Sequence, residues 1–222
     1  MIRYLTLLTN AYVAAANPVN AVAMKQYMRD QFEHLGIKTP DRRNINKAIQ
    51  AQHGLPAIAD MPVLIKALWE KPEREYQHAA IDLMQQLRKE WTLEDIHLFE
   101  YMITHKSWWD SVDNVVSFLA GPWLKKFTAV QPAVTNGWSN SDNMWLQRAA
   151  IIFQNAYKQQ TNEQLLFHYI KQHAHSKEFF IQKAIGWALR EYSKTNPDSV
   201  QTFVKRHTLA PLSRREALRR ID

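Results

Sequence analysis

Apolar residues recur along the chain at intervals of three and four positions, the spacing of one face of an α-helix. Strict alternation of apolar and polar residues, which is typical of strands, is scarce. Stretches that contain glycine and proline divide the chain into pieces of ordinary helix length, so we predict an all-α protein of about twelve helices. The clearest helical spacings are Val22, Met24, Tyr27, Met28 and Phe32; Val63, Ile65, Leu68 and Trp69; and Leu146, Ala149, Ala150, Phe153 and Tyr157.

Three of the predicted helices resemble one another. They are EREYQHAAIDLMQQL from residue 73, NMWLQRAAIIFQNAY from residue 143 and EFFIQKAIGWALREY from residue 178. In each, a glutamine is followed by a basic or imidazole side chain and then by alanine, and the central residues are His78, Arg148 and Lys183. These residues are separated by 148 − 78 = 70 and 183 − 148 = 35 positions, so a copy of the repeat should also centre on residue 113 and an earlier one on residue 43.

A period of about 35 to 40 residues with two helices in each unit is typical of an α-solenoid. The tetratricopeptide pattern is absent, and we therefore predict one domain over residues 1–222, a superhelix of HEAT-like two-helix repeats. Corresponding positions of such repeats lie along one face, where a row of basic groups would suit a phosphate backbone. The residues at these register positions are Arg43, His78, Asp113, Arg148 and Lys183.

Asp113 is the acid among the register positions, in the stretch WWDSVDNVVSFLAG. One interpretation of this stretch is helix capping, because Ser107, Asp110 or Ser111 could accept hydrogen bonds from the first free N–H groups of a helix. Capping does not explain why a carboxylate occupies the central position of a cationic row. A functional role for Asp113 does explain it.

Composition narrows the class of protein. Nearly half of the 222 residues are hydrophobic, at 46%, which is ample for a buried core. The net charge of +7 and an isoelectric point near 9.5 favour polyanionic partners. With no cysteine, the chain cannot form disulfides, thiolate metal sites or a thiol nucleophile, and this suits a cytoplasmic protein.

Other motifs are missing or weak. The N-terminal MIRYLTLLTNAYVAAANP is interrupted by polar residues, so we predict a first helix and no secretory signal, and no later apolar run reaches the length of a membrane span. His168, His173 and His175 do not form a recognisable metal-binding motif, so we expect no metal. No glycine-rich phosphate loop and no nucleophile elbow are present, and we expect no cofactor.

Two tryptophans share a helical face with register positions. Trp109 precedes Asp113 by four residues, and Trp187 follows Lys183 by four. Indole faces attract positive charge, and a carboxylate stabilises a cation that develops during bond cleavage. Cleavage of the N-glycosidic bond in DNA passes through an oxocarbenium-like sugar, and a base alkylated at N3 or N7 leaves without protonation because it is already cationic.

The chain resembles the AlkD-type DNA alkylation repair glycosylases over nearly its whole length. The resemblance rests on YMRDQFEHLGIKTPDRR, KPEREYQHAAIDLM, WWDSVD, NMWLQRAAIIFQ and FFIQKAIGWALREYSK. It implies a concave, positively charged groove that holds duplex DNA carrying cationic N3- and N7-alkylpurines, such as 3-methyladenine and 7-methylguanine. It also implies that the damaged base stays in the stack instead of flipping into a pocket.

The resemblance assigns roles to particular residues. Asp113 would be the catalytic carboxylate, and Trp109 and Trp187 would pack against the deoxyribose. Arg148 would bind a backbone phosphate, and Tyr27 would line the site. We expect a monomer; the alternative from another class is a non-catalytic HEAT-like scaffold that grips DNA or an acidic protein.

Overall fold

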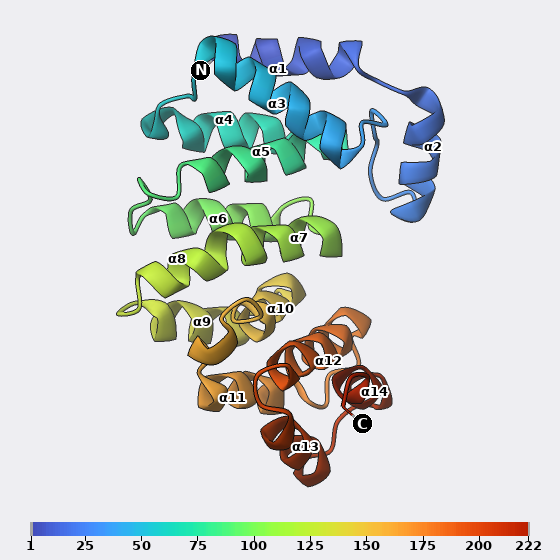
Figure 1. Ribbon diagram of the computed structural model, residues 1–222, viewed down its shortest axis with the longest axis vertical. Helices are drawn as coiled ribbons and strands as arrows, with labels where there is room; N and C mark the ends of the chain where they lie inside the picture. Colours follow the sequence, from blue (N-terminus) through green and yellow to red (C-terminus); the bar gives the residue numbers. More distant parts are fainter. Residues whose placement is uncertain (1, 222) are drawn as a thin grey trace. The chain divides into compact units, whose positions relative to one another are not determined.

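A computed structural model describes the chain from residue 2 to residue 221 (Figure 1). This part forms fourteen α-helices, two short 3-10 helices and one π-helical segment, and it contains no β-strand. The all-α prediction is confirmed, and the helix count is slightly higher than the predicted dozen. Prolines explain some of the boundaries, because seven of the helices carry proline in their first two positions, where a missing N–H costs nothing.

The chain divides into two compact units, with the boundary between Thr92 and Leu93. In the first unit, α1 packs against α3 and α4, and α5 packs against α3 and α4, so that two helix pairs are stacked. The N-terminal segment is a helix, as the sequence predicted. The elements of this unit are α1 (Ile2–Ala14), α2 (Pro18–Tyr27), α3 (Thr39–His53), η1 (Ile58–Asp60), α4 (Met61–Trp69) and α5 (Arg74–Gln86).

Helix α2 lies beside the stacked pairs of the first unit (Figure 1), and none of its residues is buried. The loop after it is held by Glu75, whose carboxylate accepts hydrogen bonds from the backbone N–H groups of residues 35, 36 and 37. Gly36 has φ +82°, and a Cβ at this residue would lie 2.0 Å from the carbonyl oxygen of Asn17. Only glycine allows the loop to approach α2 this closely.

The second unit continues the two-helix pattern. Helix α10 packs against α7 and α12, and α12 packs against α14, so these four helices follow one another through the unit. Its elements are α6 (Asp95–Thr104), α7 (Trp109–Val115), the π-helical η2 (Val116–Ala120), α8 (Gly121–Lys126), α9 (Gln131–Ser139), α10 (Met144–Ile152), η3 (Lys158–Gln160), α11 (Glu163–His173), α12 (Phe179–Ser193), α13 (Pro197–Arg206) and α14 (Pro211–Leu218).

Side-chain hydrogen bonds join residues one repeat apart. The indole N–H of Trp138 donates to Glu100 at 2.8 Å, across 38 residues of sequence. The hydroxyl groups of Thr135 and Tyr169 are 2.6 Å apart and separated by 34 residues. The period found in the sequence therefore corresponds to direct contacts between neighbouring repeats, as in an α-solenoid.

The eight tryptophans fall into two groups of four. Trp69, Trp91, Trp123 and Trp138 are buried in the core. Trp108, Trp109, Trp145 and Trp187 are half-buried, and all of them belong to the second unit. The sequence singled out two of these half-buried residues.

No helix between residues 2 and 221 is long and apolar enough to cross a membrane. Across the same residues, no group of three or more histidine and carboxylate side chains is placed to hold a metal ion.

Two helical glycines provide a matched test of this packing. At Gly186 on α12, a Cβ would lie 2.5 Å from the Cβ of Glu216, whereas at Gly137 on α9 it would meet nothing within 4 Å. Replacing Gly137 with alanine should stabilise the protein by about 0.5 to 1 kcal/mol, because alanine has the higher helix propensity. Gly186→Ala should destabilise it by about 1 to 3 kcal/mol through overpacking. Urea unfolding of both variants checks this, and a stabilising Gly186→Ala would contradict the close packing of α12 on α14.

Candidate functional site on helices α7, α10 and α12

Helix capping does not account for Asp113. The N-cap residue of α7 is Trp108, which makes no side-chain cap hydrogen bond. The hydroxyl groups of Ser107 and Ser111 donate to the carbonyl oxygens of Ile103 and Trp108, respectively. Asp113 lies one turn further along α7, away from the free N–H groups at its start.

The carboxylate of Asp113 forms a two-pronged ion pair with Arg148 of α10. The Nε and Nη2 atoms of Arg148 each lie 2.8 Å from one oxygen of the carboxylate. The remaining terminal nitrogen, Nη1, donates to the carbonyl oxygen of Phe180 in α12 at 2.6 Å. Arg148 therefore connects α7, α10 and α12, and the sequence separation of 35 residues in the ion pair is the predicted repeat length.

This ion pair is largely withdrawn from water. The side chain of Arg148 is 5% exposed and that of Asp113 is 18% exposed. Burial raises the pKa of the Asp113 carboxyl, and the hydrogen bonds and positive charge of Arg148 oppose this rise by stabilising the ionised form. Paired guanidinium and carboxylate groups hold each other in a fixed orientation.

An aromatic cluster lies next to the ion pair. The ring centroids of Trp108 and Phe180 are 5.2 Å apart, and those of Trp145 and Phe180 are 4.9 Å apart. These residues lie at the beginnings of α7, α10 and α12, and the sequence pattern did not single out Trp108, Trp145 or Phe180. The signal was present, because each of these helices carries an aromatic residue three to five positions before its register position.

The two tryptophans predicted to contact the sugar, Trp109 on α7 and Trp187 on α12, are both half-buried. Each is therefore partly accessible to solvent. Lys183 also lies on α12, and its ammonium group is 3.2 Å from Glu216 of α14. Lys183 remains 39% exposed at its side chain.

The other predicted DNA-binding residues lie in the first unit. Tyr27, at the end of α2, is 71% exposed. Together with His78 it lines a cavity of about 430 Å³ between α2, α3 and α5. Arg43 is exposed, with its Nε atom 3.8 Å from a carboxylate oxygen of Asp82.

One part of the sequence interpretation needs correction. The register positions were expected to present a row of accessible cations, but Arg148 is buried, with 4% of its surface exposed. The reason is its contact with Asp113, since an acid and a base at equivalent positions of adjacent repeats neutralise each other. The predicted repeat register is correct at Asp113 and Arg148, which are in direct contact 35 residues apart.

The second unit is thus an array of helical repeats that holds an oriented carboxylate, with two half-buried tryptophans on the same helices, α7 and α12. A family described as "DNA alkylation repair enzyme" matches residues 8–221, and the chain belongs to that family. The match spans both compact units.

Solved structures agree with this assignment. A protein described as a predicted DNA alkylation repair enzyme from Enterococcus faecalis is 38% identical, with a TM-score of 0.86 over 93% of this chain and 96% of the other. AlkD2 from Streptococcus mutans is 18% identical and has a TM-score of 0.63 over 90% of this chain and 99% of its own, which shows a shared fold. No curated protein matches the chain.

The ion pair makes a prediction about stability. Arg148→Met leaves the carboxylate of Asp113 in a partly buried site without its partner, and this should lower the free energy of unfolding by about 2 to 4 kcal/mol. The double variant Asp113→Asn/Arg148→Met should recover part of the loss, because it no longer buries an unpaired charge. Chemical unfolding of both variants measures the coupling.

A suitable control is Lys194→Met, which removes an exposed ion pair with Glu191. We expect a change of no more than about 0.5 kcal/mol. Equal losses for Arg148→Met and Lys194→Met would contradict a special role for the Asp113–Arg148 pair.

Proposed function

We propose that the protein is a monofunctional DNA glycosylase that removes cationic N3- and N7-alkylated purines from duplex DNA by hydrolysis. The observation that carries the proposal is the carboxylate of Asp113, oriented by Arg148 on α10 and located on the same helix as the half-buried Trp109. Membership of the DNA alkylation repair enzyme family supports alkylated DNA as the substrate.

Removal of a cationic purine requires one carboxylate and no separate acid to protonate the leaving base. The bond between the sugar C1′ and the purine breaks, and its electron pair leaves with the purine and cancels the positive charge of the alkylated ring. The sugar becomes an oxocarbenium-like cation, which the negative charge of Asp113 stabilises. Water adds to C1′ and releases a proton, and the product is an abasic sugar.

The aromatic residues have a complementary role in this proposal. Trp109 and Trp187 are half-buried, and the face of an indole attracts a positive charge by about 0.5 to 2 kcal/mol. They pack against the deoxyribose as its charge develops. The base remains in the stack, so the mechanism uses a surface and does not need a deep pocket.

We propose two roles for Arg148: it orients the carboxylate of Asp113, and it binds a phosphate of DNA. In the free protein its guanidinium occupies both oxygens of Asp113. In this proposal DNA binding brings a backbone phosphate up to the largely buried guanidinium, while Arg148 keeps the Asp113 carboxylate oriented beside the sugar. Lys183, Arg43, His78 and Tyr27 are the further residues that we propose to contact DNA.

Asp113→Asn tests the proposal against a scaffold without catalytic activity. Asparagine keeps the size of the side chain but removes its charge, so release of 7-methylguanine from methylated duplex DNA should fall about a hundredfold or more. Binding of the same duplex should be unchanged or tighter, because a negative charge facing the phosphates is lost. Single-turnover release and equilibrium binding are measured on the same preparation.

The exposed Asp142 provides the control, since it precedes α10 and has no role in the proposal. Asp142→Asn should retain the rate of base release. Undiminished release by Asp113→Asn would exclude Asp113 as the catalytic carboxylate, and absence of release from the unaltered protein would favour the scaffold.

A further inference from the structure

Helix α14 continues the series of packed helices α7, α10 and α12 that carries the candidate site. It packs on α12 just as α12 packs on α10. Ser213 and Ala217 of α14 are fully buried, and the hydroxyl group of Ser213 donates to the carbonyl oxygen of Gln182 at 2.9 Å. The absence of a side chain at Gly186 allows the two helices to come this close. The orientation of α14 about its own axis is therefore set by packing.

Glu216 shows which side of α14 adjoins the candidate site. Its carboxylate binds both Lys183 and Arg190 of α12. Burial acts to raise the pKa of Glu216, but the hydrogen bonds and charges of these two cations outweigh it and lower the pKa below its usual value. Glu216 follows Lys183 by 33 residues, close to the separation of 35 residues between Asp113 and Arg148. This contact therefore repeats the acid–base pairing of the site one repeat later.

The outer surface of α14 carries positive charge that no carboxylate of residues 2–221 pairs with. Arg215 and Arg219 are exposed. Arg215 lies on α14 and Arg219 is its C-cap residue, with helical backbone angles; their spacing of four residues places both on the side opposite Ser213 and Ala217. Neither arginine forms an ion pair with a carboxylate of residues 2–221, and Arg214 instead donates to the carbonyl oxygen of Val204.

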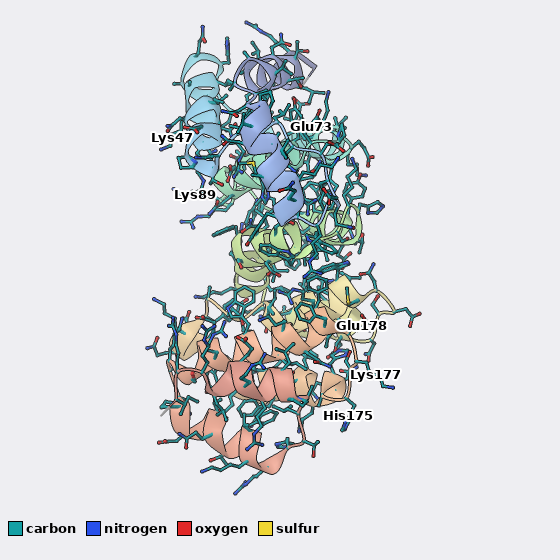
Figure 2. All side chains as sticks on the ribbon, turned by 90° about the vertical axis from the view of Figure 1, so that its right-hand side faces the viewer. Lys47, Glu73, Lys89, His175, Lys177 and Glu178 are labelled. Carbon is teal, nitrogen blue, oxygen red and sulfur yellow. The ribbon has the colours of Figure 1, made fainter. Side chains whose placement is uncertain are left out.

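Charge on α14 differs from charge in the connection between α11 and α12. In the connection between α11 and α12, the exposed Lys177 is followed directly by the exposed Glu178 (Figure 2). The segment 211–221 has four arginines and one acid, Glu216, whose charge is already shared by two cations of α12. Like charges one turn apart destabilise a helix, and an anionic partner relieves this repulsion.

We propose that Arg215 and Arg219 bind phosphate groups of duplex DNA, so that α14 extends the DNA-binding surface by one repeat beyond Lys183. This inference rests on the proposed function for the identity of the partner. Arginine suits phosphate because its planar guanidinium donates two parallel hydrogen bonds. Contacts of this kind hold the duplex in place without selecting a base sequence.

The test is the salt dependence of binding to an unmodified duplex of about 20 base pairs, between about 50 and 200 mM salt. Arg215→Ala/Arg219→Ala should weaken binding about three- to thirtyfold and reduce the log–log salt slope by about one to two. Arg215→Lys/Arg219→Lys keeps both charges and should retain most of the slope.

The matched control removes two exposed lysines from η3 and α11, Lys158 and Lys171, which lie outside the series α7, α10, α12 and α14. Lys158→Ala/Lys171→Ala lowers the net charge equally and should leave the slope unchanged. An unchanged slope in the α14 variant would overturn the inference, and so would an equal decrease in the control, which would indicate a general effect of net charge.

The rate of base release distinguishes a failure of this inference from a failure of the proposed function. At saturating protein, the α14 variant should release 7-methylguanine from methylated duplex at a rate within about twofold of the unaltered protein, because Arg215 and Arg219 do not touch the reacting sugar. If no preparation releases the base but the slope still falls in the α14 variant, the glycosylase proposal fails and the phosphate contact stands. If release is normal and the slope is unchanged, only the inference fails.

Discussion

The ion pair between Asp113 and Arg148 is the interaction on which the candidate site depends. It joins α7 to α10, and the remaining terminal nitrogen of Arg148 bonds to α12. A buried charge without a partner is costly, so each residue requires the other in order to occupy its place. The pair holds an acid at a defined position on a chain whose net charge is +7.

The same physical constraint recurs along the second unit. Lys183 and Arg190 of α12 meet Glu216 of α14, as Asp113 of α7 meets Arg148 of α10. Stacked repeats place equivalent positions against one another, and opposite charges at those positions stabilise the stack. Arg215 and Arg219 form no ion pair with a carboxylate of residues 2–221, so no carboxylate of this part of the chain competes with a polyanion for them.

Much of the fold could be predicted because helical spacing is a local property. The all-α class, the helix at the N-terminus and the repeat of about 35 residues all follow from it, and contacts such as Trp138 with Glu100 follow the repeat. For the candidate site, the repeat register correctly predicted that residues 113 and 148 occupy equivalent positions of neighbouring repeats. It did not reveal that Arg148 is buried, since exposure depends on what a neighbouring helix places against a side chain. The clustering of Trp108, Trp145 and Phe180 was missed although an aromatic residue precedes each of these register positions, because contact between the rings depends on the distances between helices.

The sequence by itself determined the helices, their repeat and the identity of the residues at equivalent positions, because each depends on the order and spacing of side chains along one chain. Only the tertiary structure decided which charges are paired, which tryptophans are buried or half-buried and where the chain divides into compact units. Those properties depend on distances between helices, and a one-dimensional pattern contains the period of the stacking but not the depth at which each side chain is buried.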